Sequence, residues 1–97
     1  MVAMDIADFR ASLDQQDPPA TLDKPLAALW YDAQGDWNRA HTLAQEQENT
    51  VGYWIHAYLH RVEGDNRNAS YWYNRAGKTP SAAPLKQEWE EIASALL

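Results

Sequence analysis

A short residue pattern occurs twice in this chain, 29 residues apart. Residues 28–40 read ALWYDAQGDWNRA, and residues 57–69 read AYLHRVEGDNRNA. The identical positions are Ala28, Gly35, Asp36 and Ala40 in the first unit, and Ala57, Gly64, Asp65 and Ala69 in the second. A repeat of this kind is typical of stacked helical hairpins, in which each unit buries its apolar face against the next. The repeat therefore predicts an all-α fold.

The Gly-Asp pair in each unit predicts the turn between two helices. Glycine readily takes the left-handed conformation that ends a helix, and aspartate caps the amino terminus of the following one. We therefore expect Gly35-Asp36 and Gly64-Asp65 to mark the tips of two hairpins.

Apolar residues at helical spacing extend this pattern over the whole chain and predict about six helices in one domain, residues 1–97. The N-terminal helix carries an apolar stripe of Val2, Ile6, Phe9 and Leu13. The predicted segments are an N-terminal cap helix within 1–20, a first hairpin at 22–48, a second hairpin at 50–78 and a C-terminal cap helix within 81–97. The short loops between them favour antiparallel packing of successive helices. We expect the two terminal helices to close the stack on both sides.

Charge and composition exclude several classes of function. The chain has a net charge of −6 and no cysteine. An acidic chain without a basic stripe argues against binding to nucleic acid or to an anionic membrane surface. Without cysteine there is no disulfide, no thiolate metal site and no thiol nucleophile. The start of the chain does not resemble a signal peptide, and no apolar run is long enough for a transmembrane helix, so we expect a cytoplasmic location.

The two units resemble tetratricopeptide (TPR) and Sel1-like helical repeats. The first unit matches that pattern at Ala28, Tyr31, Gly35 and Ala40, and the stretch NASYWYNRAG at 68–77 is similar to the second helix of a Sel1-like unit. The whole chain also resembles small bacterial proteins of this helical kind. The resemblance implies a stack of helical hairpins that serves as a non-catalytic scaffold for a protein partner, with no cofactor. It does not identify that partner.

Two histidines on the predicted fourth helix form the first candidate site. His56 and His60 are one helical turn apart, and Glu63 follows on the same stripe. Two imidazoles at this spacing can bind a divalent metal ion with a carboxylate as third ligand. The alternative is that both histidines fill the packing positions that Ala27 and Tyr31 occupy in the first unit. The sequence does not place His41, whose repeat counterpart is Ser70.

A groove of aromatic and basic residues forms the second candidate site. Arginine beside exposed aromatic rings suits recognition of a carboxylate or phosphate group. The predicted binding groove is lined by Trp30, Tyr53, His56, His60, Trp72 and Arg75. The alternative is that Trp72 packs on the neighbouring helix and that the arginines are solvated or pair with nearby acids. No phosphate-binding loop, nucleophile elbow or paired acid–base motif is present, so the sequence predicts no catalytic residues.

The C-terminal helix has an apolar stripe that includes Trp89 and Ile92. Glu88, Glu90 and Glu91 are expected on its solvated acidic face. The helix is either a cap that covers the stack or a seam through which two copies of the chain form a homodimer.

Overall fold

The computed structural model describes residues 4–97, and these residues form six α-helices without a strand. The helices are α1 (Ile6–Ser12), α2 (Lys24–Ala33), α3 (Trp37–Glu46), α4 (Thr50–Val62), α5 (Asn66–Ala76) and α6 (Leu85–Leu96). This result confirms the all-α fold with about six helices. Val2, which we placed on the first apolar stripe, lies outside the described residues. None of the helices within 4–97 has the length and apolar character needed to cross a bilayer.

The two repeat units form two hairpins with closely matched turns. The first hairpin consists of α2 and α3, and the second consists of α4 and α5. Gly35 and Gly64 have φ angles of 84° and 86°, in the left-handed region where an L side chain is strained. The amide of Asp36 donates to the carbonyl of Tyr31, and the amide of Asp65 donates to that of His60, both at 2.9 Å. Each aspartate side chain then caps the next helix.

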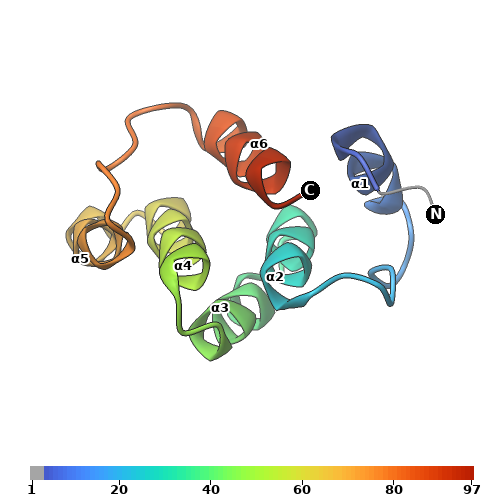
Figure 1. The fold of residues 1–97 in the computed structure, drawn as a ribbon, viewed down its shortest axis with the longest axis horizontal. Helices are drawn as coiled ribbons and strands as arrows, with labels where there is room; N and C mark the ends of the chain where they lie inside the picture. Colours follow the sequence, from blue (N-terminus) through green and yellow to red (C-terminus); the bar gives the residue numbers. More distant parts are fainter. Residues whose placement is uncertain (1–3) are drawn as a thin grey trace.

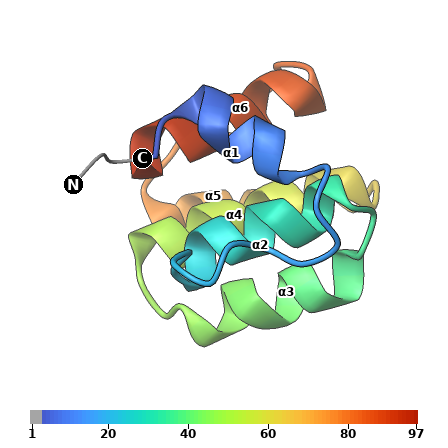
Figure 2. The ribbon, with the colours of Figure 1, turned by 90° about the vertical axis from the view of Figure 1, so that its right-hand side faces the viewer.

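The terminal helices lie on one side of the hairpins (Figures 1 and 2). Helix α6 contacts both α2 and α4, and α1 contacts α6. Figure 2 shows α3 on the opposite side of α2 and α4. We expected the terminal helices to close the two ends of a stack, and this expectation is wrong. They cover together the face along which the first helices of the two hairpins meet.

Large apolar side chains from both hairpins and both terminal helices share one core. Leu29 and Ile55 are fully buried, as are Phe9 of α1 and Ile92 of α6. The Trp89 ring stacks on that of Phe9, with 5.5 Å between ring centroids. Burying such rings removes much apolar area from water, which stabilises a domain of this small size.

Helix α1 ends at Ser12, within the segment 1–20 that we predicted for it. The Ser12 hydroxyl donates to the carbonyl of Phe9, and the Trp30 indole N–H contacts both the hydroxyl and the carbonyl of Ser12, at 3.2 and 3.3 Å. These bonds compete with further helical hydrogen bonds. They also attach α1 to α2.

Glu88 is buried, in contrast to the solvated position predicted for it. Only 1% of its surface is exposed. Its carboxylate accepts hydrogen bonds from Tyr73, Trp54 and Arg61. A buried carboxylate needs such partners because it loses its hydration shell. Glu88 thus links α6 to α4 and α5, and Arg61 pairs with it rather than with Glu63 or Asp65.

Candidate functional site

All three histidines of the chain gather at one place between the hairpins. The chain contains His41, His56 and His60 and no other histidine. Each offers a ring nitrogen, and these three nitrogens all lie within 4.8 Å of one another. His41 comes from α3, whereas His56 and His60 come from successive turns of α4. We call this group the three-histidine cluster.

The packing of α3 against α4 brings the cluster together, and two tryptophans fix its rings. The Trp37 ring stacks on His41, with centroids 4.7 Å apart and planes inclined by 12°. The Trp72 ring stacks on His56 at 3.8 Å and 14°. The Trp37 indole N–H also donates to the carbonyl of Leu59 at 2.7 Å, which ties α3 to α4. The imidazoles are therefore held in defined orientations.

Two of the imidazoles share a hydrogen bond. The Nε2 atoms of His41 and His56 are 2.9 Å apart, so one of these nitrogens donates and the other accepts. Burial of His56, together with the nearby His41 and His60 rings, lowers the pKa of His56 to about 3. Burial also lowers the pKa of His41; His60 lowers it further, whereas Glu63 opposes the change. Both rings are consequently neutral near pH 7, which is the form that binds metal ions.

Glu63 lies behind the cluster. Its carboxylate Oε1 is 2.5 Å from Nδ1 of His60. Because Nδ1 is engaged by Glu63, the remaining nitrogen of the His60 ring is Nε2. A carboxylate in this position fixes the tautomer of an imidazole and makes its other nitrogen a better metal ligand. The sequence predicted Glu63 as the third ligand, but the arrangement favours His41 in that role and gives Glu63 a supporting one.

A second group of candidate ligands lies next to the first. It consists of His60, Glu63 and Asp65, whose ligand atoms also lie within 4.8 Å of one another. Both carboxylates are exposed, and exposed acidic groups commonly occur together without an ion. The three-histidine cluster is buried or half-buried, and burial favours neutral ligands that do not repel one another.

A small cavity adjoins the cluster. It has a volume of about 200 Å³, and His56, Tyr53, Trp72 and Arg75 are among the residues that line it. The Arg75 guanidinium lies over the Tyr53 ring at 4.7 Å and over the Trp72 ring at 5.1 Å. Four residues of the predicted groove thus meet here. His60 belongs to the adjacent cluster and is 5% exposed.

Trp30 is the residue of the predicted groove that the structure places elsewhere. It is 1% exposed and hydrogen-bonded to Ser12 of α1. It belongs to α2 and is part of the main hydrophobic core.

His41 is the site residue that the sequence analysis did not place. It follows Trp37 by one helical turn on α3, and Trp37 packs against the core. That spacing is the signal that brings His41 to the edge of the buried face.

Comparisons with protein families, with curated proteins and with solved structures find no match to this chain. The chemistry of the site therefore has to be inferred from its own residues.

Proposed function

We propose that the protein binds a divalent transition-metal ion through the three-histidine cluster. The observation that carries the proposal is the convergence of every histidine in the chain, from two helices, on ring nitrogens within 4.8 Å of one another. Imidazole nitrogen is a preferred ligand of zinc, copper and nickel. Three such ligands, one on α3 and two on α4, would together hold one ion.

The local distances support this assignment. Two nitrogens bound to one tetrahedral zinc ion at 2.0–2.1 Å are about 3.3 Å apart. The His41 and His56 Nε2 atoms, at 2.9 Å, would separate by a few tenths of an ångström to admit an ion. Binding would replace their mutual hydrogen bond, and each ring would carry its proton on Nδ1. Glu63 would orient His60 from behind, as carboxylates do beside metal-bound histidines.

Three histidine ligands leave one tetrahedral position for another ligand. In zinc sites of this composition that position holds water or an exchangeable molecule. The cavity beside His56 offers a route for such a ligand, and Arg75 at its wall would favour an anion.

Melting curves with and without metal test the proposal. A ligand that binds only the folded state must raise the melting temperature by mass action. We expect Zn²⁺, Ni²⁺ or Cu²⁺ to raise it for the natural protein and to have much less effect on His41→Gln. The Asp65→Asn variant, which alters the neighbouring acidic group alone, should respond like the natural protein. An equal response of His41→Gln would assign the ion to other ligands.

We propose recognition of a protein partner as a second candidate function, through the outer face of α4 and α5. An exposed aromatic ring supports it, since Tyr71 is 54% exposed beside Arg75. Such a pair suits a carboxylate-bearing segment. A photo-crosslinking residue at position 71 should capture one protein in cells, and Arg75→Gln should abolish the capture while Arg67→Gln preserves it. Capture that is equal in both variants would contradict this candidate.

A homodimer through the C-terminal helix stays a prediction. The buried side of α6, with Trp89 and Ile92, already packs inside the chain. Leu85 and Leu97 are the large apolar residues that α6 and the end of the chain leave exposed, each at 37%.

A further inference from the structure

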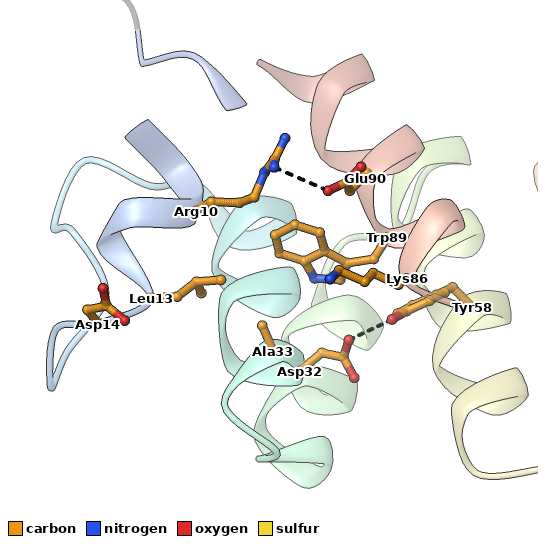
Figure 3. A pocket seen from close by; sticks show the side chains of 9 residues that line it. All are labelled: Arg10, Leu13, Asp14, Asp32, Ala33, Tyr58, Lys86, Trp89 and Glu90. Atoms are coloured by element: carbon orange, nitrogen blue, oxygen red, sulfur yellow. Dashed lines mark hydrogen bonds and ion pairs between the residues drawn. The ribbon is translucent and has the colours of Figure 1, made fainter. Parts of the chain in front are cut away.

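A second cavity lies between α1, α2, α4 and α6, on the side of the molecule that the terminal helices cover (Figure 3). Its volume is about 530 Å³, which is within the range of pockets that bind small molecules. Leu13, Ala33 and Trp89 contribute apolar wall, and Asp32 and Tyr58 contribute polar groups. None of these residues belongs to the three-histidine cluster.

The cavity contains a carboxylate that has no ionic partner in the described part of the chain. The Tyr58 hydroxyl donates to Asp32 Oδ2 at 2.8 Å, and no cationic side chain within residues 4–97 comes within 4 Å of the Asp32 carboxylate. Burial raises the pKa of Asp32, although the hydrogen bond from Tyr58 opposes the change. The ionised carboxylate is therefore partly dehydrated, and a cation placed beside it would be strongly favoured.

A second tyrosine–carboxylate pair in the molecule has a cation as its third member. The Glu88 carboxylate of α6 accepts from the Tyr73 hydroxyl of α5 at 2.6 Å and also binds the guanidinium of Arg61 on α4. Arg61 stands 29 residues after Asp32, at the equivalent position of the repeat. The Tyr73–Glu88 pair is therefore neutralised by Arg61, whereas no cationic side chain of residues 4–97 lies within 4 Å of the Asp32 carboxylate in the Tyr58–Asp32 pair.

The remaining walls suit a cation that carries an apolar group. The Trp89 indole N–H donates to the carbonyl of Leu29 at 2.9 Å, which fixes the ring at the cavity. Indole rings attract cations and also bury apolar surface. In Figure 3 the Arg10–Glu90 ion pair lies on the opposite side of this ring from Asp32, and its nitrogen and oxygen are 3.5 Å apart.

The charges around the cavity favour a positive ligand. Its lining includes three carboxylates, of Asp14, Asp32 and Glu90, and two cations, of Arg10 and Lys86. The excess is one negative charge, and Asp32 is the carboxylate with a hydrogen-bonded tyrosine and a dehydrated setting.

We propose that this cavity binds a small primary ammonium compound with an apolar body. The ammonium group would pair with Asp32, and the apolar body would lie against Leu13, Ala33 and Trp89. The proposal is independent of the metal site, because the two sites share no residue.

Titration with 2-phenylethylammonium, followed by the indole N–H resonance of Trp89 in an NMR spectrum, tests the proposal. The matched ligand is 2-phenylethanol, which has similar size and no charge. We expect saturable shifts with the ammonium compound and at least tenfold weaker binding of the alcohol. The Asp32→Asn variant, which can still accept from Tyr58, should lose that preference.

Two further variants make the result decisive. Asp14→Asn removes a carboxylate elsewhere on the lining and should keep the preference for the ammonium compound. Lys86→Met removes the flexible cation that could itself reach Asp32, and should bind the ammonium compound at least as tightly as the natural protein. The proposal is overturned if neither the natural protein nor Lys86→Met gives saturable shifts. It is also overturned if Asp14→Asn and Asp32→Asn weaken binding equally.

Discussion

The two hairpins have matching turns but carry different side chains on their first helices. Their turns have matching hydrogen bonds, and the φ angles of Gly35 and Gly64 differ by two degrees, 84° against 86°. At the positions where the second hairpin has His56 and His60, however, the first has Ala27 and Tyr31. The repeated residues thus form the turn of each hairpin, and positions that do not repeat carry the histidines of the proposed metal site.

A substitution at Gly52 should have one of the two largest effects, because it disturbs a close backbone contact at the start of the second hairpin. A Cβ atom at this position would lie 1.7 Å from the carbonyl oxygen of Gln47. The repeat counterpart is Asp23, whose side chain caps the amino terminus of α2. We expect Gly52→Ala to lower the free energy of unfolding by about 3 kcal/mol, since the chain must move to relieve the overlap. Urea denaturation measures it, and a loss below about 1 kcal/mol would contradict this close approach.

The next comparison is between the two tyrosine–carboxylate pairs. Glu88→Gln would leave the half-buried Arg61 guanidinium without its carboxylate, at an expected cost of about 3 kcal/mol. Asp32→Asn removes a charge that has no cation within 4 Å among residues 4–97 and keeps an acceptor for Tyr58, so we expect a change of about 1 kcal/mol or less. Thermal unfolding of both variants gives the ranking. Equal losses would mean that the two carboxylates have equivalent surroundings.

The three-histidine cluster should make the second hairpin sensitive to acid. The folded-state pKa of His56 is about 3, whereas its ordinary value is 6.5. Between these values the unfolded chain binds more protons, so stability is complete above about pH 6.5 and falls as the pH decreases towards 3. His41 acts in the same direction. We expect a loss of up to about 2 kcal/mol between pH 6.5 and 5.

Urea denaturation at several pH values, with a chelator present, measures this loss. In His56→Gln the pH dependence should be clearly weaker. An unchanged slope in that variant would show that other groups cause the acid sensitivity.

Small effects should also come from substitutions at the two turn glycines. A Cβ atom at Gly35 or Gly64 would meet no other atom within 4 Å, so the cost of alanine there is the strain of its left-handed backbone alone. We expect Gly35→Ala and Gly64→Ala each to cost about 1 kcal/mol. Matched losses in urea denaturation would support equivalent turns, and a difference above about 1 kcal/mol would contradict their equivalence.

Local features of the fold could be predicted from the sequence, whereas contacts between helices could not. The Gly-Asp turns and the aspartate caps depend on neighbouring residues, and the structure reproduces them. The burial of Glu88 depends on how α6 is rotated against α4 and α5. The location of α1 and α6 on the same side of the hairpins likewise depends on packing between segments far apart in the chain.

The candidate site likewise has residues that the sequence identified and one that only helix packing brings in. The spacing of His56 and His60 within one helix identified them as neighbours. His41 became part of the cluster only through the packing of α3 on α4, because its repeat counterpart, Ser70, carries no information about that contact.

Titration calorimetry with Zn²⁺ tests the central proposal most directly. We predict one ion bound per chain, with affinity reduced at least tenfold by His41→Gln, His56→Gln or His60→Gln, in variants whose helical circular dichroism is intact. Asp65→Asn should bind as the natural protein does. No saturable binding by the natural protein, or unchanged affinity in His41→Gln, would contradict a metal site at the three-histidine cluster.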